Sequence, residues 1–156
     1  MLKNFYRALL ATVVCFVCVF SYSEAASSNR YWNDNANYPF VGGHAGYFQY
    51  LDLSSCTFVS RNNGGYEIAA CWVGYHKLYR EQTNGVIKFR QRQGAARPEF
   101  YDEKKKQWVV MPRIPQGAEA QREGLTYADF RSKYHTWEFN MFTLTYEQLF
   151  GKRFGA

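Results

Sequence analysis

The feature that most constrains the fold is a pair of strand-forming runs separated by a short polar turn. The runs Cys56–Arg61 and Tyr66–Val73 carry β-branched and aromatic residues, and Asn62-Asn63-Gly64-Gly65 lies between them. Asn and Gly accept the left-handed backbone angles that tight hairpin turns require. The stretch therefore predicts a β-hairpin, and with it an antiparallel sheet.

Each run of this hairpin holds one cysteine. A four-residue loop closed by Arg61 and Tyr66 places Cys56 directly opposite Cys71 in a non-hydrogen-bonded pair, where Cα atoms lie about 4.5 Å apart. That separation suits a disulfide, which would stabilise the hairpin by about 3 kcal/mol at most. A two-residue Asn63-Gly64 turn keeps the opposition but gives a wider pair. We predict a structural disulfide, with a redox role as the alternative.

Further strands are predicted on both sides of the hairpin. Tyr47–Leu51 is an aromatic run, preceded by a glycine-rich turn at Val41–Gly46. A second hairpin is expected to join Tyr75–Gln82 to Val86–Gln93 through Thr83-Asn84-Gly85, since Asn-Gly is a strong turn signal. A third is expected to join residues 99–101 to residues 107–111, followed by a polar loop over residues 116–124.

The C-terminal part of the chain predicts a helix. Thr126 is a good N-cap, and Gly151 is a plausible stop. Large apolar residues recur between them at steps of three and four, which is the spacing of one helix face. A break between Thr136 and Thr145 is an alternative, because aromatic and Thr residues lower helix propensity there. The fold class expected is α+β: an antiparallel meander of about five to seven strands with a C-terminal helix packed on one face.

The N-terminus resembles a secretory signal. Lys3 and Arg7 precede an uncharged apolar run from Ala8 to Phe20, and Ser23-Glu24-Ala25 offers a small-x-small cleavage site. We predict a signal peptide over residues 1–25, a loose segment over 26–46 whose Tyr31 and Trp32 can pack against the domain, and one domain over 47–156. The run is short for a membrane span, so no stable span is expected after cleavage, and an uncleaved anchor is the alternative. The protein is then exported, to the periplasm, the cell surface or the medium.

Charge favours anionic partners. Removal of residues 1–25 leaves 17 basic and 12 acidic residues, a net charge of +5. Lys88, Arg90 and Arg92 alternate along a strand and share one face, where they can bind sulfate, phosphate or carboxylate groups. The alternative is a solvated face that protects a sheet edge from aggregation. For an exported protein, we expect an anionic surface polymer or a protein as ligand and no nucleic acid.

Catalytic motifs are not found. The histidines at 44, 76 and 135 lack the spacing of metal ligands. Ser54 and Ser55 lack the context of a nucleophile elbow, and Asp102-Glu103 does not resemble a glycosidase pair. The sequence predicts a non-enzymatic protein without metal or cofactor.

The order of elements resembles the surface-adhesin protein E type family of small exported bacterial proteins. The similarity covers about Tyr47 to Phe150, and its residues are Tyr50-Leu51-Asp52-Leu53-Ser54-Ser55, Tyr66-Glu67-Ile68-Ala69-Ala70, Phe100-Tyr101-Asp102 and Trp108. It implies an adhesin-like module that can self-associate, and no catalysis.

Two functions are therefore expected. The first is an exported, adhesin-like binding module for anionic or protein ligands. The second is a periplasmic accessory protein, such as an enzyme inhibitor or an envelope-assembly factor, that uses a loop such as Pro112–Gly124.

Overall fold

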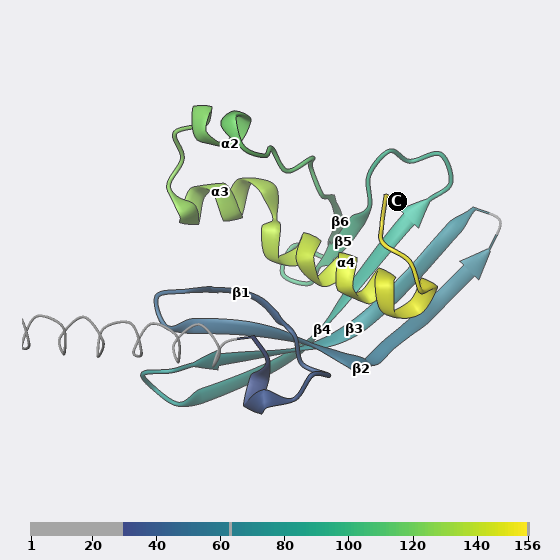
Figure 1. The fold of residues 1–156 in the computed structure, drawn as a ribbon. Helices are drawn as coiled ribbons and strands as arrows, with labels where there is room; N and C mark the ends of the chain where they lie inside the picture. The colour runs from purple at the N-terminus through teal and green to yellow at the C-terminus, as the bar shows by residue number, and fades with distance from the viewer. Residues whose placement is uncertain (1–29, 63, 156) are drawn as a thin grey trace, which may run out of the picture.

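A computed structural model describes residues 30–62 and 64–155 of the chain. Within them a six-stranded antiparallel sheet has its strands in chain order, and helices follow at the C-terminal end (Figure 1). The α+β meander predicted from the sequence is confirmed. The predicted signal peptide, residues 1–25, lies outside the described residues. The elements are η1 (Trp32–Asp34), β1 (Phe40–His44), β2 (Tyr47–Asn62), β3 (Gly65–His76), β4 (Glu81–Arg92), β5 (Glu99–Asp102), β6 (Gln107–Val110), α2 (Ala118–Arg122), α3 (Tyr127–Tyr134) and α4 (Thr136–Phe150).

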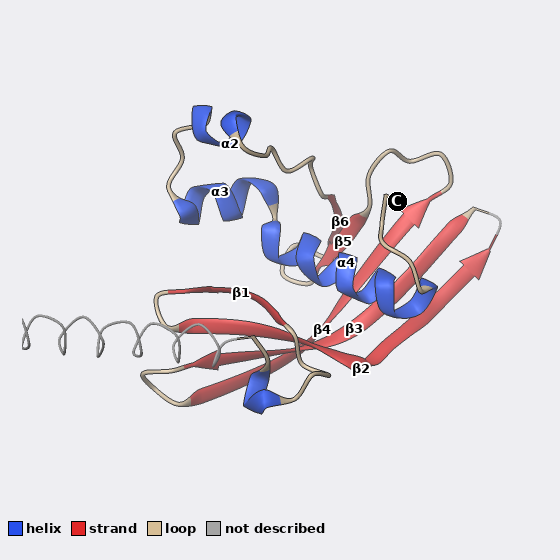
Figure 2. Cartoon of the chain, viewed as in Figure 1, coloured by secondary structure: helices blue, strands red, loops and turns tan. Residues whose placement is uncertain are grey.

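The sheet is strongly twisted and curls into a half-barrel (Figure 2). β2, β3 and β4 are long and run its full length. The short β1 pairs only with the first part of β2, over Tyr47–Tyr50. β5 pairs only with the last part of β4, at Phe89 and Arg90. The two ends of the sheet therefore differ: β1 lies beside the first part of β2, and β5 lies beside the last part of β4.

The core lies between the sheet and α4. Phe142 of α4 is fully buried and meets Phe89 of β4 edge to face, with ring centroids 5.6 Å apart. Leu51 and Ile68, from β2 and β3, are also fully buried in this cluster. α4 is further tied to the sheet edge by Asn140, whose side-chain Nδ2 donates to the Val41 carbonyl at 2.9 Å. Burial of large aromatic rings is the main stabilising contribution here.

The C-terminal helical region begins and ends where the sequence indicates. The Thr126 hydroxyl accepts a hydrogen bond from the Asp129 amide, which makes it the N-cap of α3. Gly151 ends α4 in the left-handed conformation. The break falls at His135, earlier than expected. His135 is itself left-handed, with φ of 48°, and its ring packs 4.9 Å from Phe100.

The second hairpin was placed wrongly by the sequence. The turn between β3 and β4 is Lys77–Arg80, and Asn84-Gly85 lies inside β4. Gly85 is opposite Trp72, and a Cβ built on Gly85 would lie 2.6 Å from the indole ring. This glycine makes room for a large neighbour and does not form a turn.

Two other local predictions also need correction. Phe40–His44 forms the edge strand β1, and the turn expected there is confined to Ala45-Gly46. The loop expected over residues 116–124 contains the short helix α2. The third hairpin is confirmed, because β5 and β6 pair across residues 103–106.

Candidate functional site

The two cysteines do not face each other across the ladder. Arg61 pairs with Tyr66 as expected, and the pairing continues to Asn62 and Gly65, so the connection is two residues long. Farther along, Asp52 pairs with Cys71, because irregularities insert extra residues into β2. Cys56 and Cys71 are free thiols. The predicted disulfide is therefore wrong in this structure.

The main irregularity is stabilised by side chains of the sequence Asp52-Leu53-Ser54-Ser55. An Asp52 carboxylate oxygen accepts from the Ser54 amide at 3.0 Å. The Cys71 amide donates to the Ser55 hydroxyl at 2.7 Å, and that hydroxyl donates to the Asp52 carbonyl at 2.6 Å. A hydroxyl thus replaces a backbone partner of the ladder. Short polar side chains often compete with regular secondary structure in this way.

The thiol of Cys56 should react slowly. Burial raises its pKa to about 11, so very little thiolate is present at pH 8. We expect alkylation by iodoacetamide at pH 8 to be about 100-fold slower than for an ordinary exposed cysteine. Peptide mass spectrometry over time checks this rate, with the protein unfolded in urea as control. Rapid labelling of Cys56 in the folded protein would contradict its burial.

The predicted basic face is engaged within the molecule. Lys88, Arg90 and Arg92 share one face of β4, as the alternation predicts, but Arg90 and Arg92 both form ion pairs with the buried carboxylate of Glu99. The Arg90 guanidinium also lies 4.3 Å from the Trp108 ring centroid. Arg90 and Arg92 therefore share one carboxylate, which compensates one of the three positive charges of this face.

Glu99 is ionised at the centre of this network. Burial raises its pKa, but hydrogen bonds and charges from Arg90 and Arg92 lower it more, so the net pKa lies below its ordinary value. A carboxylate with two guanidinium partners is suited to stabilising the β4–β5 pairing. The arrangement does not suit a general acid, which needs a raised pKa.

The histidines lie apart, each against an aromatic ring: His44 with Tyr127, His76 with Tyr79 and His135 with Phe100. In the described part of the chain, no three His, Cys, Asp or Glu side chains gather in a way that could hold a metal ion. Among the helices of residues 30–62 and 64–155, none has the length and apolar character needed to cross a membrane.

An aromatic cleft that the sequence did not indicate lies at the β1 end of the sheet. It has a volume of about 520 Å³ and is open to solvent. Its lining comes from the segment around η1, from β2, β3 and β4, and from the turn between β3 and β4. The lining residues are Tyr31, Trp32, Asn33, Phe48, Tyr50, Tyr75, Lys77, Arg80 and Gln82. We refer to this group as the aromatic cleft.

The floor of the aromatic cleft is built by strand register. Phe48 pairs with Tyr75, and Tyr75 pairs with Gln82, so one row crosses β2, β3 and β4 on the same face. Tyr50 lies two residues beyond Phe48 and points to this face as well. Burial raises the pKa of the Tyr50 hydroxyl, which keeps it a neutral hydrogen-bonding group.

One wall of the aromatic cleft is formed by the segment before β1. Tyr31 makes a β-bridge to Pro39, and the Trp32 amide donates to the Tyr38 carbonyl at 3.0 Å. The Trp32 and Tyr38 rings also meet edge to face, 5.2 Å apart. These contacts order a segment that the sequence indicated to be loose. They bring Tyr31 and Trp32 beside strands that lie much later in the chain.

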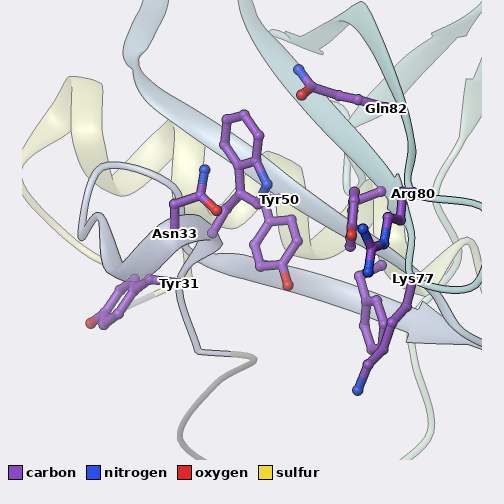
Figure 3. A pocket seen from close by; sticks show the side chains of 9 residues that line it. Tyr31, Asn33, Tyr50, Lys77, Arg80 and Gln82 are labelled. Atoms are coloured by element: carbon purple, nitrogen blue, oxygen red, sulfur yellow. The ribbon is translucent and has the colours of Figure 1, made fainter.

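The opposite wall carries positive charge. Lys77 and Arg80 come from the β3–β4 turn, and among the described residues neither side chain has an ion-pair partner. Figure 3 shows Tyr50 between Tyr31 and Asn33 on one side and Lys77 and Arg80 on the other. Arg80 has φ of 54° and Asn33 has φ of 51°. The turn residues Ala45 and Lys106, which lie outside the cleft, share this conformation.

The sequence held a partial signal for this cleft. Phe48 and Tyr50 alternate on one face, but the Asn84-Gly85 turn signal predicts a strand at Lys77 and Arg80, which lie in the β3–β4 turn. The position of the segment around η1 depends on tertiary contacts that no local pattern shows.

Comparisons with known proteins do not indicate a function, so the functional site is inferred from the geometry of the structure. No family model, no curated protein and no solved structure matches this chain. The resemblance to the surface-adhesin protein E type family therefore remains a prediction. The aromatic cleft, with its uncompensated lysine and arginine, is the feature of the described residues best suited to bind a ligand.

Proposed function

We propose that the protein is an exported, non-catalytic binding module that takes an anionic ligand in the aromatic cleft. The observation that carries the proposal is the position of Lys77 and Arg80, two cations without an acidic partner among the described residues, beside an aromatic floor. Sites of this size, lined by aromatic rings with a few polar groups, are typical of small-molecule binding.

The charge distribution favours this site over the β4 face. Arg90 and Arg92 already share the carboxylate of Glu99, and this negative charge reduces the attraction of the β4 face for a ligand anion. Lys77 and Arg80 have no ion-pair partner among the described residues, so only water must be displaced from them. An arginine also offers a planar fork of donors that matches carboxylate, sulfate and phosphate oxygens.

A second candidate is the accessory protein that docks on one endogenous partner. The observation in its favour is the surface around α2 and the start of α3. α2 has no buried residue, and Leu125 and Tyr127 nearby are 38% and 53% exposed. Exposed apolar side chains of this kind suit protein contact. This docking would depend little on salt, and a partner retained at high salt on the Leu125 and Tyr127 surface would favour it.

The charge-removal experiment is a double substitution in the cleft. Lys77→Gln with Arg80→Gln should weaken binding of the protein to a polyanion such as polygalacturonate or heparin at least about 10-fold, because charge-assisted contacts are lost. The matched control is Arg122→Gln with Lys152→Gln, which removes the same charge from exposed positions. Affinity is measured by calorimetry, and wild-type binding should weaken as salt rises.

Equal affinity of the cleft variant and wild type would contradict the proposal. If Lys88→Gln weakens polyanion binding and the cleft variant does not, the binding site lies on the β4 face. Lys88 suits that comparison because it forms no ion pair among the described residues and lies 5.8 Å from the Tyr101 ring centroid.

A further inference from the structure

We infer that the ligand of the aromatic cleft is an acidic saccharide, a sugar unit or chain that carries a carboxylate or sulfate group. The inference rests on the proposed function and adds the chemical class of the ligand. Three properties of the cleft point to this class: the arrangement of its rings, the side-chain amides at its walls, and the confinement of its charge to one side.

The rings of the cleft are not stacked on one another. Among the ring contacts of the described residues, none joins two of the five cleft aromatics. Their ring partners lie outside the lining: Trp32 meets Tyr38, and Phe48 and Tyr50 both meet Phe40. Ring surface of the half-buried residues Trp32 and Tyr75 is therefore left for a ligand. The apolar C–H face of a sugar ring packs well on such surfaces, and aromatic side chains contribute large contact area at low entropic cost.

The amides supply acceptors as well as donors. Asn33 and Gln82 line the cleft, and the Gln82 amide nitrogen donates to Asn84 at 3.1 Å, which fixes its orientation. A side-chain amide offers an oxygen acceptor beside its donors. A bare phosphate or sulfate needs donors alone and would leave these oxygens unmatched. Sugar hydroxyls donate and accept, so they can satisfy both kinds of group.

The charge lies on one side of the cleft. Lys77 and Arg80 are on the turn, whereas Tyr31 and Asn33 form the opposite wall (Figure 3). A ligand that fits must combine an anionic group at one end with an uncharged, hydroxyl-rich body at the other. The volume of about 520 Å³ falls within the range of small-molecule sites, and the open mouth allows a longer chain to continue outward.

The experiment compares five probes by calorimetry: oligogalacturonate, a heparin-derived oligosaccharide, neutral maltohexaose, ATP and inorganic sulfate. The indole N–H signal of Trp32 in a two-dimensional NMR spectrum locates the binding, and that of Trp108 serves as the reference beside the β4 face. At least one acidic saccharide is expected to bind and shift Trp32, with maltohexaose at least about 10-fold weaker. Comparison of oligogalacturonate with the heparin-derived oligosaccharide shows whether a carboxylated or a sulfated saccharide binds more tightly.

Two variants separate the contributions. Lys77→Gln with Arg80→Gln should abolish the preference for acidic over neutral saccharide. Asn33→Gly keeps the left-handed backbone accessible and should weaken saccharide binding several-fold through loss of the amide. Unchanged saccharide affinity in Asn33→Gly would overturn the assigned role of that amide.

The failures are distinguishable. Binding of ATP or sulfate that depends on Lys77 and Arg80, without binding of either acidic saccharide, would overturn the inference and leave the proposed function standing. Equal binding of maltohexaose and the acidic oligosaccharides would overturn the acidic part of the inference. No Trp32 shift with any anionic probe would overturn both.

Discussion

Phe142→Ala is expected to lower the free energy of unfolding by about 4 kcal/mol. The Phe142 ring is fully buried, and it contacts Phe89 of β4 together with Tyr146 and Phe154. Truncation leaves a cavity between α4 and the sheet that rigid strands cannot close. Urea unfolding followed by circular dichroism measures the change.

The control for this substitution is Leu78→Ala. Leu78 lies in the β3–β4 turn and is 76% exposed, so its truncation should change stability by less than about 0.5 kcal/mol. A loss below about 2 kcal/mol for Phe142→Ala would mean that α4 packs less tightly on the sheet than the structure indicates.

Glu99→Gln is expected to cost about 2 kcal/mol at neutral pH, because it removes the charge-assisted hydrogen bonds from Arg90 and Arg92 to the buried carboxylate. Thermal or urea unfolding measures the loss. Glu103→Gln is the matched control: Glu103 pairs with Lys106 in the exposed β5–β6 turn, and surface pairs contribute at most about 1 kcal/mol. Equal effects of the two substitutions would contradict the central position of Glu99.

The loss of stability caused by Glu99→Gln should become smaller as the pH falls. The folded-state pKa of Glu99 is lowered, so its contribution to stability is present above the unfolded pKa of about 4.3. It is lost as the pH falls through the folded pKa. The stability difference between wild type and Glu99→Gln should therefore shrink in acid. A difference that grows below pH 4 would contradict the assigned ionisation.

Local chemistry made much of this fold predictable. Thr126 and Gly151 delimit the helical region correctly because capping depends on a few neighbouring residues. The turn between β5 and β6 was also found, since a charged run separates two aromatic strands. The break at His135 was missed, because nothing in its neighbourhood shows that Phe100 holds its ring.

The errors share a physical cause. Asn84-Gly85 resembles a turn, but the glycine is needed beside Trp72 of the adjacent strand. Register arithmetic placed Cys56 opposite Cys71, but Ser55 takes a backbone partner and shifts the ladder. In both cases a side chain from another part of the sheet decides the outcome. The aromatic cleft was missed for the same reason, since its two walls lie in segments far apart in sequence.

The hydrogen bond from Asn140 to the Val41 carbonyl has a consequence for the order of folding. Each strand pairs with its neighbour in the chain, so the sheet can grow by successive short-range closures that cost little entropy. α4 is different, because it joins an edge strand 99 residues away in sequence. Its docking is the long-range step, and such steps slow folding. The edge of the sheet that is synthesised first is thus completed by the segment that is synthesised nearly last.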